Sequence, residues 1–332
     1  MTRPITIAGG GLAGLALGIA LRLRDVNVTI HEASVYPRQR VCGEFISGIS
    51  DEALERLGIS GSLNSAVPLS TACWRSDTEI LREMNVTGRG ISRWKLDDLL
   101  QGHFRSLGGN LITRSRILPG PGVIWAAGRP KSPSSWIGLK CHVHDLPLSH
   151  DLEMLLGTNG YVGLARIEEG RVNVCGLFKK QRIGNEQGPG LLIAYLRAGG
   201  LHQLSERLSE ASIIRESFVG VAGFRFGSSG EIPFSLGDAS CIIPPFTGNG
   251  MSMALESADY ALQPALDYAA GSRSWEEASR ASSLKQKECF RKRMTAASLI
   301  HPLLTSASGL RVVKSLAVAR ILPFETIYRL LR

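Results

Sequence analysis

The sequence has few aromatic residues and no regular arrangement of cysteines. Aromatic side chains make up 6% of its 332 residues, and none of the six cysteines forms a C-x-x-C pair. Scattered cysteines exclude a disulfide-stapled scaffold and indicate reduced thiols, so we expect a cytoplasmic protein. The cysteines are Cys42, Cys73, Cys141, Cys175, Cys241 and Cys289.

The sequence shows neither an export signal nor a membrane-spanning segment. Its first residues, MTRPITIAGGGLAGLALGIAL, are apolar, but the glycines among them and the acidic residues that follow are typical of a strand, a turn and a helix. Hydrophobic residues make up 44% of the chain. This content is enough to bury a core in one large domain or in two coupled ones.

Acidic residues are scarce at the C-terminal end. Between residues 285 and 332, ten basic residues stand against two acidic ones, so this segment carries +8 of the net charge of +9. We expect a solvated helical face, with peripheral contact to a membrane or contact to an acidic carrier protein as the alternative. The lack of interleaved aromatic residues argues against nucleic acid. The ten residues are Lys285, Lys287, Arg291, Lys292, Arg293, Arg311, Lys314, Arg320, Arg329 and Arg332.

A glycine-rich turn near the N-terminus is the first motif with a chemical meaning. The segment ITIAGGGLAG places Gly9, Gly11 and Gly14 in G-x-G-x-x-G spacing between a β-rich run and a helical run. The first glycine makes a tight turn, the second lets the backbone approach a diphosphate, and the third lets helix and strand pack closely. The phosphates bind at the helix N-terminus, at Leu12 and Ala13.

An acidic residue follows at the distance that this motif requires. The next β-rich run, VNVTIHE, ends at Glu32, eighteen residues after Gly14. A carboxylate here accepts hydrogen bonds from both hydroxyls of an adenosine ribose and repels a 2′-phosphate. The motif therefore predicts an adenine dinucleotide and leaves FAD and NAD as alternatives.

A second glycine-rich turn lies more than two hundred residues later, in SLGDASCIIPPFTGNGMSMALESA. An NAD domain has no need of such a loop, whereas the long FAD molecule needs support for its ribityl chain and ring. We expect Asp238 to accept a ribityl hydroxyl, and Pro244 and Pro245 to stiffen the loop. Gly248 and Gly250 would let backbone amides face the ring at a helix N-terminus. The second turn therefore favours FAD.

Both turns and four further segments give a resemblance to a known family. The segments are RQRVCGE at 38–44, ISR at 91–93, LDDLL at 96–100 and AAGR at 126–129. On these residues the chain resembles the FAD-dependent monooxygenase superfamily, the p-hydroxybenzoate hydroxylase fold group, which also includes geranylgeranyl reductases and flavin halogenases. The resemblance covers residues 5–258.

The resemblance implies FAD as cofactor and NAD(P)H as electron donor. It implies that Arg40 crosses the ribityl and diphosphate region, that Cys42 lies close to the flavin, and that Arg93 faces the cofactor. The residues expected at the cofactor are Gly9, Gly11, Leu12, Ala13, Gly14, Glu32, Arg40, Cys42, Arg93, Gly237, Asp238, Pro245, Gly248, Asn249, Gly250 and Met251.

The middle of the chain predicts an antiparallel sheet. Between residues 136 and 178, short β-rich runs alternate with Gly and Asn turns. In the family that the chain resembles, such a sheet covers the flavin and shapes the substrate cavity. Alternation places His142 and His144 on one strand face, with His150 nearby, but a metal site would need more ligands at fixed spacing. We expect no metal.

The segment YVGLAR, residues 161–166, stands where the reductase branch carries Y-x-W-x-F-P. Tyr161 is kept, whereas Gly163 and Ala165 replace two large rings, which would open the pocket. None of the five tryptophans forms the W-x-W-x-I-P motif of the tryptophan halogenases.

Three functions follow in order of preference. The first is a monooxygenase of secondary metabolism that hydroxylates or epoxidises an aromatic, polyketide-like or other apolar small molecule through a flavin C4a-hydroperoxide. The second is a flavin-dependent reductase or dehydrogenase of an alkene or prenyl chain. The third is a non-catalytic binding protein. The cofactor carries the chemistry in the first two, which agrees with the lack of a Ser-His-Asp triad or paired carboxylates.

The predicted fold is α/β. A Rossmann-like FAD-binding domain comprises residues 1–66, 86–130 and 220–284, and a substrate-facing β-sheet domain comprises 67–85 and 131–219. Residues 285–332 form a basic helical extension, with helices broken at Pro302, Gly309 and Pro323. We expect a monomer.

Overall fold

The computed structural model describes residues 2–130, 132–228, 232–319 and 330–331. Its N-terminal part is built on a parallel sheet of four strands in the order β6-β2-β1-β7. The strands are β1 (Ile5–Ala8), β2 (Val28–Glu32), β6 (Asn110–Thr113) and β7 (Val123–Trp125). The chain therefore forms the predicted strand, turn, helix and strand around the first glycine motif.

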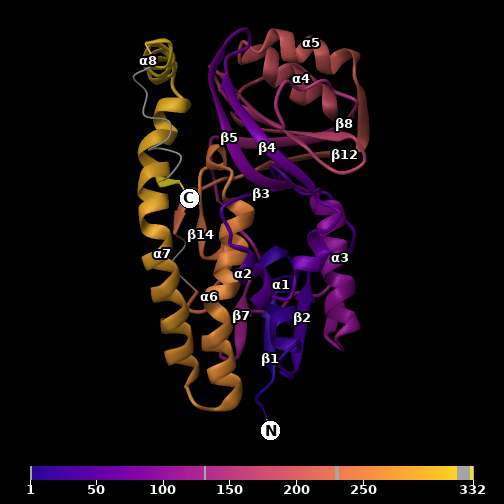
Figure 1. The fold of residues 1–332 in the computed structure, drawn as a ribbon, viewed down its shortest axis with the longest axis vertical. Helices are drawn as coiled ribbons and strands as arrows, with labels where there is room; N and C mark the ends of the chain where they lie inside the picture. Colours follow the sequence, from indigo (N-terminus) through magenta and orange to yellow (C-terminus); the bar gives the residue numbers. More distant parts are fainter. Residues whose placement is uncertain (1, 131, 229–231, 320–329, 332) are drawn as a thin grey trace.

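Helices from distant parts of the chain cover this sheet. Ten consecutive residues of the central helix, from Leu12 to Leu21, are buried. This helix packs against two others, one from the middle of the chain and one that follows the second glycine-rich turn (Figure 1). The helices of this part are α1 (Leu12–Arg22), α2 (Asp51–Arg56), the 3₁₀ helix η1 (Ser60–Leu63), α3 (Arg93–Ser106) and α6 (Gly250–Ala270).

Two glycines let β1, α1 and β7 approach one another without intervening side chains. A Cβ atom on Gly14 would lie 2.0 Å from the carbonyl oxygen of Gly9. Gly9 has a φ of +108°, and a Cβ there would lie 2.2 Å from the carbonyl oxygen of Ala126. The roles of the first and third glycines in turning and packing are as predicted.

A second sheet has eight strands in the order β12-β8-β11-β10-β9-β4-β5-β3. The neighbours pair antiparallel, except that β4 and β9 pair parallel. This confirms the antiparallel sheet predicted between residues 136 and 178. The strands are β3 (Phe45–Ile46), β4 (Val67–Arg75), β5 (Ile80–Gly90), β8 (Trp136–His144), β9 (Leu152–Gly157), β10 (Gly160–Arg166), β11 (Arg171–Lys179) and β12 (Ser212–Ala222).

Two short helices, α4 (Pro189–Ala198) and α5 (His202–Glu210), lie beyond one side of this large sheet (Figure 1). Their buried leucines pack with β8, β10 and β11 in a separate core cluster. The domain division made from the sequence remains a prediction, and its boundaries at 85 and 220 fall within β5 and β12.

The chain then returns to the parallel sheet through short elements, and two helices follow in the part of the chain that the structure describes up to residue 319. The short elements are β13 (Gly227–Ser228), η2 (Gly237–Ala239), β14 (Cys241–Ile242) and η3 (Pro245–Thr247). The long helix α7 (Trp275–Leu304) begins with a capping box between Ser274 and Glu277 and runs beside α6 (Figure 1). It is followed by α8 (Ala307–Val318).

The predicted helix breaks are wrong at two positions. Helix α7 continues through Pro302 to Leu304, and Gly309 lies in the first turn of α8. The break falls between them because the Ser306 hydroxyl accepts a hydrogen bond from the amide of Gly309 and starts a new helix. Pro323 lies outside the described residues.

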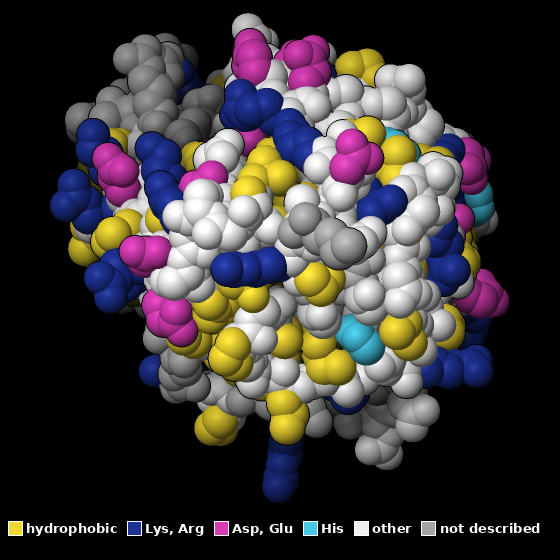
Figure 2. Space-filling view, turned by 90° about the horizontal axis from the view of Figure 1, so that it is seen from below, with side chains coloured by type: hydrophobic (Ala, Val, Ile, Leu, Met, Phe, Trp, Pro, Cys, Tyr) yellow, Lys and Arg dark blue, Asp and Glu magenta, His cyan; other side chains and the backbone are white. Residues whose placement is uncertain are grey.

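The basic tail is only partly a surface feature. Arg293 is buried and binds Glu256, with Nη1 and Oε2 2.7 Å apart. Lys285, Lys287, Arg291 and Arg311 are exposed, while Arg320, Arg329 and Arg332 lie outside the described residues. Figure 2 shows Lys and Arg side chains along the edge of the molecule where α7 runs, with acidic side chains between them. Contact with a membrane or carrier protein remains a prediction.

Within the described part of the chain, no helix is both long and apolar enough to cross a lipid bilayer.

The tight contact at Gly14 predicts a stability difference between two helical glycines. Gly14→Ala should lower the free energy of unfolding by about 1–3 kcal/mol, because its Cβ would overlap the carbonyl oxygen of Gly9. Gly102→Ala on the exposed face of α3 meets no atom within 4 Å and should raise it by about 0.5–1 kcal/mol. Urea unfolding of both variants measures the difference, and equal stabilities would contradict the account.

Candidate functional site

One cavity of about 680 Å³ lies between the two sheets and the N-termini of α1 and α6. Its volume falls within the range of about 300–1,000 Å³ that is typical of ligand sites. Fourteen of the sixteen residues predicted at the cofactor line it: Gly9, Gly11, Leu12, Ala13, Glu32, Arg40, Cys42, Arg93, Gly237, Asp238, Pro245, Gly248, Gly250 and Met251.

The other two predicted residues lie behind the cavity wall. Gly14 packs against Gly9, as described above. Asn249 is fully buried and donates a hydrogen bond from its side chain to the carbonyl oxygen of Leu331. Both residues therefore serve the packing of the turns in this structure, and their contact with a cofactor stays a prediction.

The N-terminus of α1 is open to the cavity. Gly11 is the N-cap residue, and no side chain caps the helix. A Cβ on Gly11 would meet only Nη2 of Arg40, at 3.9 Å. This Nη2 is buried and has no hydrogen-bond partner among the described residues. Free helix amides beside a guanidinium nitrogen without a hydrogen-bond partner form a site suited to a phosphate.

Glu32 at the end of β2 is held in a fixed orientation. Its Oε2 accepts a hydrogen bond from the amide of Gly10 at 2.9 Å, and its Oε1 accepts one from the amide of Ser34 at 2.9 Å. Arg38 lies 3.1 Å from Oε1. A carboxylate oxygen can accept two hydrogen bonds, so Oε2 retains acceptor capacity. The predicted contact of Glu32 with a ribose is not tested by these distances.

A buried carboxylate connects the two arginines predicted at the cofactor. Asp97 on α3 is fully buried and accepts hydrogen bonds from Arg40 Nε at 3.0 Å and from Arg93 Nε at 2.8 Å. The Arg93 guanidinium is largely buried at the cavity wall. Asp97 therefore fixes both cations where they line the cavity, although it was not among the residues predicted at the site.

The second glycine-rich turn lines the same cavity, with Gly237 beside Ala13 of α1. Gly248 has a φ of +68°, and a Cβ there would lie 2.3 Å from the Phe45 ring. Asp238 exposes its surface to the cavity, yet protein surrounds it closely enough that burial raises the pKa of its carboxyl group. The nearby Arg129, Arg93 and Arg40 oppose this rise. Asp238 is thus an acceptor placed beside cationic groups.

Sequence reasoning missed a fully buried charge network at the cavity, in which Glu44 lines the cavity and Lys140 and His142 lie behind it. Glu44 lies 3.0 Å from Lys140 Nζ and 2.5 Å from His142 Nε2, and none of the three side chains is more than 1% exposed. Burial opposes ionisation of Glu44, but the hydrogen bond to His142 and the charge of Lys140 prevail and lower its pKa. Lys140 in the apolar run WIGLKCHVH was the available signal, because an unpaired lysine is rarely buried.

The part of the cavity under the large sheet is apolar. Its wall includes Met154, Tyr161, Phe224 and Phe246. Burial raises the pKa of the Cys42 thiol, so Cys42 stays protonated at neutral pH and is not an activated nucleophile. This end of the cavity therefore suits an apolar ligand without covalent attachment to the protein.

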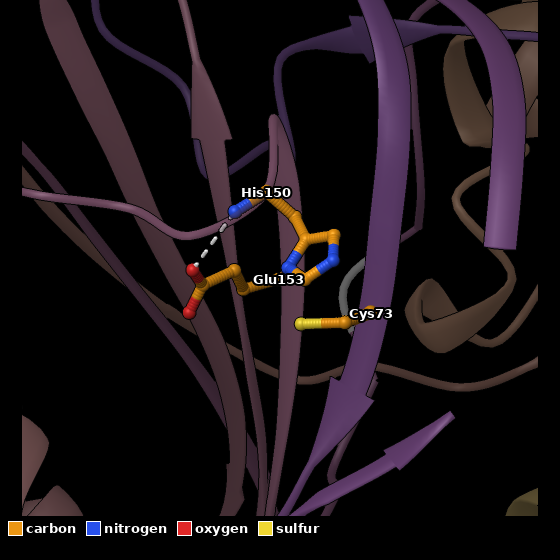
Figure 3. Close-up of side chains that lie close together, drawn as sticks. All are labelled: Cys73, His150 and Glu153. Carbon is orange, nitrogen blue, oxygen red and sulfur yellow. Dashed lines mark hydrogen bonds between the residues drawn. The ribbon is translucent and has the colours of Figure 1, made fainter. Parts of the chain in front are cut away.

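Of the three histidines of the middle segment, His142 and His144 lie two residues apart on β8, as predicted, and His150 lies outside this strand. His142 binds Glu44, whereas His150 lies near Cys73 and Glu153, whose donor atoms are all within 4.8 Å of one another. Figure 3 shows this group, with a dashed line from the backbone amide of His150 to Glu153. Glu153 also accepts hydrogen bonds from Ser149 and lies 3.4 Å from Arg75. The carboxylate is thus already paired, and the absence of a metal stays a prediction.

Comparison with known proteins gives matches in fold only. No family model matches the sequence, and no curated protein matches it. PqsL of P. aeruginosa, solved with 2-aminobenzoylacetate, is similar at a TM-score of 0.73 and 14% identity over 93% of this chain and 98% of that chain. The p-nitrophenol 4-monooxygenase PnpA of Pseudomonas putida has a TM-score of 0.69 and 13% identity, covering 98% of each chain. A triple mutant of the flavin-dependent brominase Bmp2 has a TM-score of 0.72 and 16% identity over 98% and 96%.

These similarities confirm the α/β fold class. The chain has the fold shared by PqsL, described as a probable FAD-dependent monooxygenase, by PnpA and by the brominase. The resemblance inferred from the sequence motifs is therefore confirmed at the level of fold.

The buried network predicts a strong effect of removing one partner. Lys140→Met should lower the free energy of unfolding by about 3–5 kcal/mol, because it leaves the Glu44 carboxylate buried without its cation. The double variant Lys140→Met/Glu44→Gln should recover a large part of this loss. Thermal and urea unfolding at neutral pH measure both values, and a single variant as stable as the parent chain would contradict the pairing.

The same network gives stability a defined pH dependence. Because folding lowers the pKa of Glu44, its carboxylate contributes stability at neutral pH that is lost as the pH falls through the lowered pKa. The Glu44→Gln variant should therefore lose less stability than the parent chain on acidification from pH 7. Unfolding curves at several pH values check this, and parallel pH profiles would argue against the assignment.

Proposed function

We propose that this protein is an FAD-dependent monooxygenase that hydroxylates or epoxidises an apolar, aromatic or polyketide-like small molecule. The observation that carries the proposal is the single cavity in which the turns around Gly11 and Asp238 meet. One end offers helix amides and the Arg40 guanidinium group, and the other end is apolar. This arrangement fits a long molecule with a diphosphate and a planar ring.

The residues present fit FAD at each part of its length. The amides at the start of α1 and Arg40 Nη2 would bind the diphosphate, and Asp238 would accept a hydrogen bond from the ribityl chain. The N-terminus of α6, beginning at Gly250, would stabilise negative charge on the ring. Bound FAD would supply the electron transfer and oxygen activation.

The protein itself has a limited chemical task in this proposal. The apolar wall around Tyr161 and Phe246 would exclude water and orient the substrate. The Tyr161 hydroxyl already accepts a hydrogen bond from the amide of Phe246 at 3.2 Å, which holds the second turn against the large sheet. No general acid or base is assigned.

The substrate class is supported by similarity. PqsL was solved with 2-aminobenzoylacetate and PnpA is named for p-nitrophenol, both aromatic compounds, and the apolar wall here suits such a ring. We propose NAD(P)H as the electron donor. The alternative, reduction of an alkene or prenyl chain, is favoured by one observation: Cys42 and Gly43 line the cavity, as the reductase resemblance implies.

Gly11 provides a sharp test of cofactor binding. Its φ of −84° is open to any residue, and a Cβ there meets no protein atom closer than 3.9 Å. Gly11→Val should therefore fold normally but obstruct the diphosphate, raising the dissociation constant of FAD by about 100-fold or more, equivalent to about 2.7 kcal/mol. Titration followed by flavin absorbance or calorimetry measures the constant.

The matched control is Gly61→Val, an exposed glycine with no atom within 4 Å of a Cβ. It should bind FAD as the parent chain does. An unaffected Gly11→Val variant, or a parent chain that takes up no FAD, would overturn the assignment of the cavity.

Turnover distinguishes the two reactions. The FAD-loaded protein should oxidise NADH or NADPH faster when an aromatic substrate is present and should incorporate oxygen into the product. Anaerobic reduction of an alkene without oxygen incorporation would instead support the reductase.

A further inference from the structure

A second, smaller cavity of about 100 Å³ adjoins the main one. Gly43, Phe45, Met154, Gly163 and Phe246 line both, so the two spaces share one wall. Most other residues around the smaller cavity are apolar side chains of β4, β5, β9 and β10. A space with mainly apolar walls is a poor site for water and suits a hydrocarbon group.

Strand β10 leads from the main cavity into the smaller one. Tyr161, Gly163 and Ala165 alternate onto one face of the strand. Tyr161 lines the main cavity, Gly163 lines both, and Ala165 lines the smaller one. The side chain is therefore large at Tyr161 and small or absent at Gly163 and Ala165. At Gly163, where the two cavities adjoin, the backbone of β10 itself forms the wall.

Gly163 leaves the junction open. A Cβ added there would meet only the carbonyl oxygen of Cys175, at an ordinary contact distance of 3.8 Å. Met154 stands directly opposite in the β9–β10 register and also lines both cavities. Met154 is an unbranched, flexible side chain that can adapt to a ligand. A larger residue at position 163 would fill the space between the cavities.

We propose that the smaller cavity binds an apolar arm of the substrate whose reacting part lies in the main cavity. This inference rests on the proposed function and narrows its substrate class to compounds with a hydrocarbon substituent. An apolar cavity of about 150 Å³ can hold benzene, so a cavity of about 100 Å³ suits an alkyl group of roughly three to five carbons. The lining residues that the two cavities share, Gly163 and Met154 among them, carry the assignment.

The test is a series of para-alkyl phenols, from methyl to pentyl, titrated calorimetrically against the protein with and without bound FAD. Each added methylene that enters the cavity should tighten binding by about fourfold, so the butyl compound should bind about 60-fold more tightly than the methyl compound. Flat affinities along the series, or no binding in either form, would overturn the inference. Failure to load FAD would count against the proposed function alone, because the FAD-free titration still tests the smaller cavity.

Two variants and a control test whether the gain in affinity with alkyl chain length arises in the smaller cavity. Gly163→Leu should reduce the gain along the series to less than about threefold. Ala165→Leu, which fills the smaller cavity from its far side, should do the same if Gly163→Leu unfolds. Gly102→Leu on the exposed surface of α3 should keep the full gain. A folded variant of either kind that keeps the chain-length dependence would contradict the assignment.

Discussion

The close approach of β1, α1 and β7 is the constraint on which the rest of the structure depends. Gly14 packs against the backbone of Gly9, and Gly9 packs against the backbone of Ala126. Neither glycine position has room for a side chain. The amide of Ala126 donates to the carbonyl oxygen of Ala8 at 2.7 Å, which ties β7 to the end of β1. This packing brings the N-terminus of α1 to the edge of the parallel sheet, where the large cavity opens.

Buried carboxylates then fix the cationic side of that cavity. Glu32, Glu44 and Asp97 are each at least 97% buried, and each accepts hydrogen bonds from two or more groups. Their partners include Arg38, Arg40, Arg93 and Lys140, of which the three arginines line the cavity. Because these cations are held by buried acids, the wall keeps a defined geometry and a positive potential suited to an anionic ligand.

The first glycine-rich turn and the acidic residue after it could be predicted from the sequence because both lie within one short segment of the chain. The spacing of Gly9, Gly11 and Gly14 and the position of Glu32 follow from backbone geometry within one βαβ unit. The helix breaks were less successful, since Ser306 supplies a helix cap between Pro302 and Gly309. The contact of His142 with Glu44 was missed because Glu44 belongs to a distant segment.

The pairing of strands that are far apart in the sequence could not be predicted from sequence patterns. Nothing local indicates that β4 pairs in parallel with β9, eighty residues later, or that β3 joins the edge of the large sheet through β5. The cavity under that sheet depends on these pairings, so the apolar half of the site could be anticipated only as an opening around Gly163. The smaller cavity that adjoins it became visible only in three dimensions.

The central claim is that two turns far apart in the sequence enclose one flavin. The most direct measurement is a crystal structure of the protein grown with FAD. We expect electron density for FAD, with its diphosphate beside Gly11 and Arg40, its ribityl chain beside Asp238, and its ring between Gly248 and the large sheet. FAD bound elsewhere, or a cavity that excludes it at saturating concentration, would contradict the account.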